Sequence, residues 1–271
     1  MNIGIIGFGN MGSMLANGFL KSNILNENHL YIHTRTPERV DKFLSKNKNV
    51  VYAENVEFLV SQCNLIFICV KPLDCIKFLS QINHQLINYQ HLVSIAGAVS
   101  IADIESIYLG KITKLMPTIL SDVGAGISLI AHNQNVDEND KSFLQDLLLP
   151  LGKTIEVNEN EFESLTNLTS SGPGLMAALI AQFAKAGVRY STLSNKLVEE
   201  IVIQTLYGTA KLLIDNQINF SDLIEKVATK GGITEEGIKV IENELPIVMN
   251  HVFEATLQKY ELFKQKLKKL E

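Results

Sequence analysis

The chain opens with a short apolar run that breaks into three spaced glycines, and this pattern constrains the fold most. Ile3–Ile6 is followed by Gly7, Gly9 and Gly12 in a G-x-G-x-x-G arrangement, and helix-forming residues come next. A dinucleotide suits such a strand, turn and helix, because the glycines permit the turn, the approach of backbone to pyrophosphate, and close helix–strand packing. Free N–H groups and the dipole at the helix start would bind the phosphates. The sequence therefore predicts a nucleotide site containing Gly7, Phe8, Gly9, Asn10, Met11 and Gly12.

Length and charge set broad limits on the class of protein. A chain of 271 residues suffices for one large domain or two moderate ones with an ample core. The net charge of −5 and the scattered basic residues argue against a nucleic-acid or anionic-membrane partner. The strand and glycines leave no room for a signal peptide, and no apolar run is long enough to span a bilayer. We therefore expect a cytoplasmic protein that binds neither nucleic acid nor membrane.

The cysteines do not form a recognisable metal or disulfide motif. Cys63, Cys69 and Cys75 are odd in number and lie in or beside one apolar run, with no histidine cluster nearby. This arrangement is typical of small buried side chains in a reducing compartment. We expect no metal site.

Apolar runs alternate with helical patterns through the first half of the chain. Strands are expected at residues 2–6, 30–33, 50–52, 65–70, 91–95 and 112–116, with further ones at 127–131 and 154–157. Helices are expected between them, at residues 11–22, 37–45, 55–62, 73–81 and about 137–149. This alternation predicts an α/β fold with a Rossmann-type doubly wound sheet and helices on both of its faces.

The texture of the sequence changes after residue 158, where helical periodicity continues to Glu271 without a convincing strand. We therefore expect a Rossmann domain at residues 1–158 and an all-helical domain at 159–271. The helix expected at 197–214 is apolar nearly all round, with Gly208 and Ala210 allowing close backbone approach. A helix with so little polar face must be buried, and a helical domain of this size can hardly enclose it alone. A partner subunit is the natural explanation.

The second strand indicates which nucleotide is bound. An NAD site usually has an acidic residue at the end of this strand, which accepts from the ribose 2′-OH. Here the strand ends in His33, Thr34, Arg35 and Thr36 instead. Arg35 would bond a 2′-phosphate through its forked guanidinium, and both threonines offer hydroxyls. Although Arg35 would also suit a solvated loop, the missing carboxylate favours NADP.

Further strand ends are expected at the same edge of the sheet. The apolar run at residues 65–70 ends in Lys71 and Pro72. Because the carboxyl ends of parallel strands border the ligand crevice, Val70, Lys71 and Pro72 are expected beside the cofactor, while Lys71 would equally suit the surface. The same reasoning assigns the walls of the nicotinamide pocket to Ala96, Gly97, Met116 and Pro117.

A second glycine-marked loop opens a helix late in the chain. Gly231 and Gly232 would expose backbone N–H groups, and Thr234 is expected as the N-cap with Glu235 and Glu236 in the first turn. Two interpretations remain open for this loop. It is either a well-capped helix start or a small-anion site for the carboxylate of a substrate.

Together these segments resemble the pyrroline-5-carboxylate reductase family. The resemblance covers nearly the whole chain and includes the glycine fingerprint and Gly172-Pro173. Its most specific element is residues 227–237. It implies an oxidoreductase that reduces the cyclic imine 1-pyrroline-5-carboxylate to L-proline with NADPH, in proline biosynthesis. It also implies a helical dimerisation domain, a homodimer or higher homo-oligomer, and an active site between the cofactor and residues 229–234 of a partner subunit.

On this resemblance we assign roles to the loop at residues 229–234. Thr234 is the expected catalytic residue, hydrogen-bonded to the ring nitrogen of the imine. Thr229 and the N–H groups of Gly231 and Gly232 would hold the substrate carboxylate, and Lys230 would add a charge contact. The remaining task of the protein is to orient the imine beside the nicotinamide.

Several positions depart from the family pattern. Residues 116–120 read Met-Pro-Thr-Ile-Leu in place of Met-Pro-Asn-Thr-Pro, residues 169–173 read Thr-Ser-Ser-Gly-Pro in place of Ser-Gly-Ser-Gly-Pro, and Lys230 replaces a proline. Residues 67–74 and 230–238 are more similar to the ComER-type late-competence branch of the family. The alternative is therefore an NADP-binding regulatory dimer with weak or no reductase activity.

A hydroxyacid dehydrogenase of the same architecture is a further alternative. It would need a catalytic lysine four residues before Asn or Asp, on the helix after the interdomain turn. That helix offers Lys185 followed by Arg189, which does not fit. Lys211 and Asp215 have the spacing, but their helix comes later and is expected to be buried.

Overall fold

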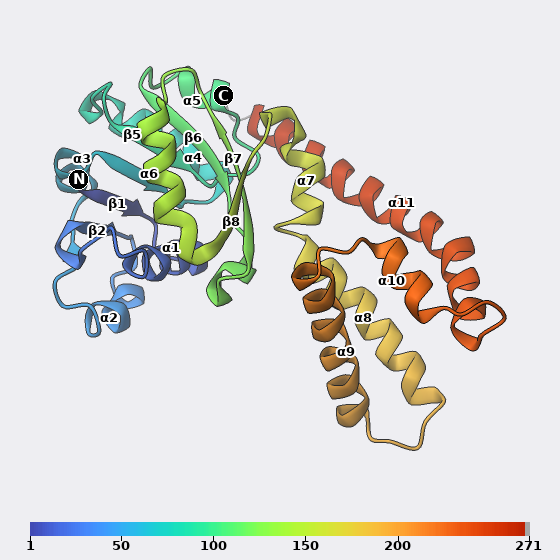
Figure 1. Cartoon of the computed structure of the whole chain (residues 1–271). Coiled ribbons are helices and arrows are strands. Elements are labelled where there is room, and N and C mark those ends of the chain that lie inside the picture. The colour runs from blue at the N-terminus through green and yellow to red at the C-terminus, as the bar shows by residue number, and fades with distance from the viewer. Residues whose placement is uncertain (269–271) are drawn as a thin grey trace. The chain divides into compact units, whose positions relative to one another are not determined.

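A single mixed sheet forms the core of the N-terminal part of the protein (Figure 1). The structure, a computed structural model, describes residues 1–268, so the end of the helical pattern expected to reach Glu271 lies outside the described residues. The sheet contains eight strands: β1 (Ile3–Ile6), β2 (Leu30–His33), β3 (Val51–Tyr52), β4 (Leu65–Ile68), β5 (His91–Ser94), β6 (Lys111–Met116), β7 (Gly126–His132) and β8 (Gly152–Glu156).

The strand order shows where the direction of sheet growth reverses. The order is β3-β2-β1-β4-β5-β6-β7-β8, and every neighbouring pair is parallel except β6 with β7. The chain first adds β2 and β3 on one side of β1, and then places β4 on its other side. This creates a topological switch point between β1 and β4. The predicted doubly wound sheet is confirmed, but β7 and β8 run antiparallel to the other six strands, which the sequence did not indicate.

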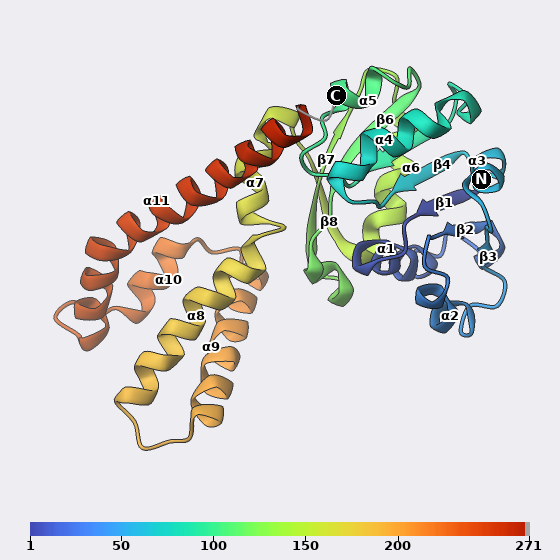
Figure 2. The same ribbon diagram turned by 180° about the vertical axis from the view of Figure 1, so that it is seen from behind.

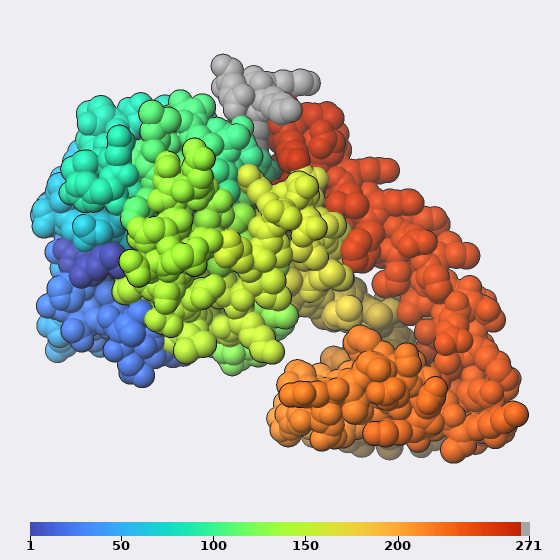
Figure 3. All heavy atoms as spheres, turned by 45° about the horizontal axis from the view of Figure 1, so that its top comes forward, coloured from blue at the N-terminus to red at the C-terminus, as the bar shows by residue number. Residues whose placement is uncertain are grey.

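Helices cover both faces of the sheet (Figures 1 and 2). One face packs against α1 (Asn10–Leu20), α2 (Glu38–Leu44) and α6 (Glu138–Leu148). The other face packs against α3 (Val56–Gln62), α4 (Pro72–Ile82) and α5 (Ile101–Glu105). The space-filling view shows α6, in yellow-green, covering the first of these faces (Figure 3). The helices anchor to the sheet through large apolar side chains, as where the rings of Phe19 and Phe67 lie 4.7 Å apart.

The remaining elements are helical: α7 (Phe162–Leu168), α8 (Gly172–Arg189), α9 (Asn195–Asp215), α10 (Phe220–Val227) and α11 (Ile233–Lys268). No strand follows β8 in the part of the chain that the structure describes. Pro173 lies in the first turn of α8, where its missing N–H does no harm. Within residues 1–268, no helix has both the length and the apolar composition needed to cross a bilayer.

By contacts the chain divides into two compact units. One contains Met1–Pro173 together with the residues from Leu257 onward, and the other is Gly174–Thr256. Helix α11 contributes to both units. A contact-based unit is not the same as an independently folding domain, so the expected division at residue 158 stays a prediction.

The second unit has almost no apolar core of its own. Within residues 174–256, all of which the structure describes, Ala184 and Val198 are the only buried apolar side chains. The α9 helix, expected to be covered by a partner subunit, is largely exposed in the single chain, with Ile203 60% and Leu206 45% exposed. A helical unit that leaves so much apolar surface in water is incomplete as a monomer.

Candidate functional site

Four loops expected to bind the cofactor meet at one edge of the sheet. They follow the carboxyl ends of β1, β2, β4 and β5, which are neighbours in the order β2-β1-β4-β5. Residues 7–12 follow β1, residues 34–36 follow β2, residues 70–72 follow β4, and residues 96–97 follow β5. Because parallel strands present their carboxyl ends at one edge, these segments lie side by side at the switch point. This is the position where open α/β sheets bind ligands.

The geometry of the three glycines fits their predicted roles. Gly7 has a φ of +97°, and a Cβ atom there would lie 2.5 Å from the Cys69 carbonyl oxygen. A Cβ on Gly12 would lie 2.1 Å from the Gly7 carbonyl oxygen, so only glycine lets the turn and α1 pack this closely. A Cβ on Gly9 would meet nothing within 4 Å. The Gly9 backbone therefore borders open space, which suits the approach of a pyrophosphate.

The first turn of α1 is left open to an anion. Among the described residues, no side chain caps this turn, and the turn contains no acidic residue. By contrast, α3, α5 and α6 are capped by the side chains of Asn55, Ser100 and Asp137. Free N–H groups and an uncompensated positive dipole at α1 make it the natural phosphate site of the sheet edge.

The loop after β2 separates a buried threonine from an exposed arginine. Thr34 is buried, and its hydroxyl accepts a long hydrogen bond of 3.4 Å from the Thr36 amide. The Arg35 side chain is 85% exposed, and its guanidinium lies 3.6 Å from the carboxylate of Asp74 on α4. Phe8 is buried and its ring packs 5.2 Å from that of Phe43, so Phe8 offers the cofactor only its backbone.

The loops after β4 and β5 complete the edge. Lys71 is exposed and precedes α4 as its N-cap, and Pro72 is the first helical residue. The segment after β5 turns sharply, with the Val99 amide donating to the Ala96 carbonyl at 3.0 Å. Ala96 is buried, and a Cβ on Gly97 would lie 2.8 Å from Cε of Met116. The turn at residues 96–99 therefore rests against the end of β6.

The loop at residues 229–234 lies in the second unit and differs from expectation in one respect. Helix α11 begins at Ile233, so Thr234 lies inside its first turn and is not the N-cap. The reason is that Glu235 reaches back, and its carboxylate accepts from the Gly231 amide at 2.6 Å. The Gly232 amide donates to the Thr229 carbonyl at 2.8 Å. In this conformation both glycine amides expected to bind a carboxylate already have partners.

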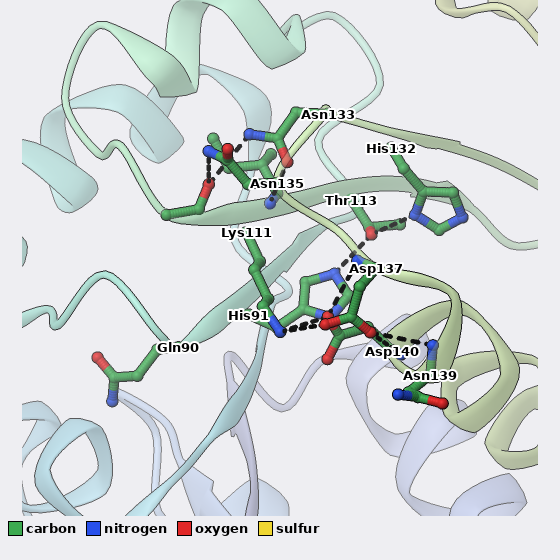
Figure 4. A network of polar contacts seen from close by, with 12 residues as sticks. Gln90, His91, Lys111, Thr113, His132, Asn133, Asn135, Asp137, Asn139 and Asp140 are labelled. Carbon is green, nitrogen blue, oxygen red and sulfur yellow. Dashed lines mark hydrogen bonds and ion pairs between the residues drawn. The ribbon is translucent and has the colours of Figure 1, made fainter.

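A polar network lies at the opposite, amino-terminal edge of the sheet (Figure 4). The Thr113 hydroxyl bridges Nε2 of His91 at 2.6 Å and Nδ1 of His132 at 2.7 Å. Lys111 pairs with Asp137 and Asp140 at 3.1 and 2.5 Å. Burial lowers the pKa of His91 to about 4 and also lowers the pKa of His132. Their distance from the switch point indicates a structural role for these groups.

The cysteines lie in the first unit as free thiols. Burial raises the pKa of Cys63 and Cys69 to about 12 and that of Cys75 to about 11, which makes reactive thiolates rare. Residues 1–268 contain no group of three or more His, Cys, Asp or Glu side chains arranged to hold a metal ion.

Comparison with known proteins identifies the family. The family profile described as pyrroline-5-carboxylate reductase dimerisation matches residues 159–262, and one described as NADP oxidoreductase, coenzyme F420-dependent, matches residues 2–97. Pyrroline-5-carboxylate reductase 3 of Bacillus subtilis is 39% identical over 98% of both chains. This chain belongs to the pyrroline-5-carboxylate reductase family. The expected class, an NADP-type oxidoreductase with a Rossmann domain, is confirmed.

Two further relatives bear on cofactor and branch. ComE operon protein 4 of Bacillus subtilis is 31% identical over 96% of both chains. The crystal structure of Plasmodium falciparum pyrroline carboxylate reductase with NADP bound superimposes with a TM-score of 0.83 at 26% identity, covering 97% of this chain and 98% of that one. The match to a dimerisation profile supports homo-oligomerisation of the present chain.

The structure also bears on the dehydrogenase alternative. Lys211 and Asp215 form an ion pair on α9, with side chains that are 57% and 51% exposed. Such a solvated pair along one helix is an ordinary surface feature, since residues four apart lie on the same face. Nothing distinguishes this pair as catalytic.

Sequence reasoning missed two residues near the predicted site, Asp74 and Tyr260. Asp74 could have been found, because it lies in the first turn of the helix that follows Lys71 and Pro72. Tyr260 donates a hydrogen bond to the Gly97 carbonyl from 163 residues away, and no local pattern signals such a contact.

Proposed function

We propose that this protein reduces 1-pyrroline-5-carboxylate to L-proline with NADPH, in the cytoplasm. The observation that carries the proposal is the uncapped first turn of α1 at the β1–β4 switch point, with the four predicted loops around it. The 39% identity to a pyrroline-5-carboxylate reductase supports the reaction.

The proposed cofactor site divides into two ends. The amides of residues 9–12 hold the pyrophosphate, and Arg35, with the hydroxyls of Thr34 and Thr36, holds the 2′-phosphate. Val70, Lys71 and Pro72 border the site after β4, and Ala96 and Gly97 border the nicotinamide. When bound, NADPH supplies the hydride that reduces the imine carbon.

The proposed substrate loop orients the imine and its carboxylate. A pyrroline nitrogen is basic enough to arrive protonated, so the reaction needs no obligatory general acid from the protein. The hydroxyl of Thr234 would accept a hydrogen bond from the ring N–H, and it is free for this task because it does not cap α11. Thr229 would bind the carboxylate, and Lys230 would add a charge contact. The task of these groups is positioning.

Binding of the carboxylate by the glycine amides would require a change in the loop. Glu235 occupies the Gly231 amide, and its negative charge would repel an anionic substrate. We propose that Glu235 withdraws toward Lys239, whose Nζ lies 3.8 Å from its carboxylate, when the substrate carboxylate binds. Gly231 has a φ of +75°, and because it lacks a side chain its backbone can adopt other conformations at little cost.

The proposed assembly is a homodimer, or a multiple of it, formed through the helical unit. Helices α8 and α11 border a groove of about 490 Å³ that includes Ile180, Phe183, Val240, Ile241 and Val248. The lining is almost entirely apolar, and Phe183 is 64% exposed in the single chain. A helix of a second copy would cover such a groove, since an apolar helix face binds in an apolar groove. The partner's loop at residues 229–234 could then complete the active site.

A second candidate function is a regulatory dimer that binds NADP with weak or no turnover. The 31% identity to ComE operon protein 4 and the altered positions Thr118, Leu120 and Lys230 favour it. The cofactor edge would be the same in both cases. The higher identity to the reductase makes catalysis the leading proposal.

A steady-state assay distinguishes the two candidates. The purified protein is mixed with NADPH and 1-pyrroline-5-carboxylate, nucleotide oxidation is followed by absorbance, and proline is measured chromatographically. Stoichiometric proline formation supports the reductase. Tight NADPH binding in calorimetry without proline formation would refute the reductase and make the regulatory dimer the leading account.

A further inference from the structure

The end of helix α11 is fixed to the proposed nicotinamide wall by a tyrosine. The Tyr260 hydroxyl donates a hydrogen bond to the Gly97 carbonyl oxygen, and both residues belong to the first compact unit. The internal bond of the turn at residues 96–99 uses the Ala96 carbonyl, so Tyr260 binds the next carbonyl along the turn. Tyr260 therefore restrains the Gly97 carbonyl, which the internal hydrogen bond of the turn does not use.

Neighbouring charges hold the tyrosine in place. Lys264 lies one helical turn after Tyr260, so the two share a face of α11. Lys264 forms an ion pair with Glu163 on α7, and its Nζ lies 5.6 Å from the centre of the Tyr260 ring. A cation over an aromatic face is attracted to it. Lys264 thus orients the ring of Tyr260 so that its hydroxyl points at the Gly97 carbonyl.

Helix α7 is in turn anchored to the sheet beside the same turn. Lys114 of β6 is buried and pairs with Glu159 at 3.1 Å, and its Nζ lies 5.1 Å from the centre of the Phe162 ring. Two residues further along β6, Met116 packs against Gly97. The turn at residues 96–99 is therefore held from two sides. Met116 of β6 packs against it directly, and Tyr260 of α11, which α7 connects to β6, binds it through Gly97.

We propose that Tyr260 is a positioning residue of the cofactor site, which holds the turn at residues 96–99 against the nicotinamide through its hydroxyl. This inference rests on the proposed function, because that function assigns Ala96 and Gly97 to the nicotinamide wall. Burial raises the pKa of Tyr260 to about 12, so the phenol stays protonated and remains a donor at physiological pH. A wall held 1 Å out of place would misalign hydride transfer.

The test compares two tyrosine-to-phenylalanine variants. Tyr260→Phe removes only the hydroxyl and keeps the ring beneath Lys264, while Tyr190→Phe makes the same change at a side chain that is 92% exposed. For Tyr260→Phe, kcat should fall about three- to tenfold, the effect expected for one lost neutral hydrogen bond. The isotope effect with NADPH deuterated at the transferred position should rise, and the KM for the imino acid should stay within about twofold. Tyr190→Phe should match the wild type.

Hydrogen exchange tests the positioning without catalysis. Amides of residues 94–99 should exchange faster in Tyr260→Phe than in the wild type or Tyr190→Phe, and NADPH should protect them less. Unchanged exchange and an unchanged isotope effect would overturn the proposal. If the wild type does not reduce the imino acid, the proposed function fails, while exchange and NADPH titration still decide the role of Tyr260. Should Tyr260→Phe not fold, Glu163→Gln removes the anchor of Lys264, and unchanged exchange at residues 94–99 would then refute the proposal.

Discussion

The guanidinium of Arg35 lies 3.6 Å from the carboxylate of Asp74, and the two residues come from different loops of the proposed cofactor site. Arg35 follows β2, and Asp74 lies in the first turn of α4. The Arg35 side chain is 85% exposed and the Asp74 side chain 49% exposed, so water weakens their attraction. Arg35 is therefore available to a ligand phosphate, but it faces a competing carboxylate. This relationship leads to opposite predictions for the two residues.

Replacement of Arg35 by alanine should remove most of the preference for NADPH over NADH. A charge-assisted hydrogen bond to phosphate contributes about 1.5–3 kcal/mol, so NADPH affinity should fall by about one to two orders of magnitude. NADH affinity should change little. Calorimetric titration of both nucleotides measures this difference, with Lys153→Ala on β8, near the far edge of the sheet, as the charge-matched control. Equal affinities of the wild type for NADPH and NADH would contradict the assignment of Arg35.

Replacement of Asp74 by asparagine should act in the opposite direction. The change removes a negative charge beside the proposed 2′-phosphate site and releases Arg35. Because an exposed ion pair contributes at most about 1 kcal/mol, NADPH should bind about two- to threefold more tightly. NADH lacks the phosphate and should be less affected. Weaker binding of NADPH by Asp74→Asn would show that the carboxylate orients Arg35 productively instead of competing for it.

The cofactor edge could be predicted because its signals are local. The spacing of Gly7, Gly9 and Gly12 and the apolar runs fix the strand ends, and the alternation of strands and helices brings those ends together. The reversed direction of β7, which β8 shares, could not be predicted. Its apolar run has the same composition as a parallel strand, and the direction depends on the path of η3 (Ile119–Val123) and the adjoining loop.

The proposed substrate loop gives a prediction that separates catalysis from binding. Thr234→Ala should lower kcat while leaving NADPH affinity nearly unchanged, because its hydroxyl is assigned to the imine nitrogen. Thr229→Ala should chiefly raise KM, because a carboxylate is bound similarly in the ground and transition states. Steady-state kinetics with both substrates varied measures these effects, and Thr192→Ala in the exposed α8–α9 loop serves as the control. A normal kcat in Thr234→Ala would remove this residue from the mechanism.

The start of α11 shows why part of the site was mispredicted. Threonine is a favoured N-cap, and Thr234 precedes two glutamates, so the sequence favours a cap there. In the structure Ile233 is the first helical residue although it is 95% exposed. The bond from the Gly231 amide to Glu235 stabilises the earlier start. A side chain that reaches back over four residues is not visible in hydrophobic periodicity.

The assembly of the helical unit gives the next prediction. A charge placed at Ile203 or Leu206 on α9 should dissociate the oligomer or lower solubility, because an unpaired buried charge is strongly destabilising. Light scattering at micromolar concentration should show at least a dimer for the wild type and a smaller species for Leu206→Asp. Gln204→Asp adds the same charge at a position that is already polar and should have a smaller effect. A monodisperse wild-type monomer would refute an interface through the helical unit.

The buried histidine network should make stability depend on pH. The pKa of His91 is lowered to about 4, chiefly because burial penalises its charged form. The charges of Asp140 and Asp137 raise this pKa by smaller amounts, and those of His132 and Lys111 lower it further. In the unfolded chain this pKa returns to about 6.5. Between these values the unfolded state binds more protons, so the free energy of unfolding falls as pH drops from about 6.5 to about 4. The full contribution is present above that window.

The total loss below pH 4 should be about 3–4 kcal/mol for His91, because each unit of its pKa difference between the folded and unfolded chain corresponds to about 1.4 kcal/mol. Urea unfolding at several pH values measures it. His91→Gln should be less stable at neutral pH, since its bond to Thr113 is altered, but its stability should vary less with pH. The exposed His84→Gln variant should keep the wild-type slope, since it leaves the buried network intact. Asp137, whose pKa is held at about 2 by hydrogen bonds from the Asp140 amide and Lys111, loses its charge below this window. A wild-type slope in His91→Gln would show that other groups carry the pH dependence.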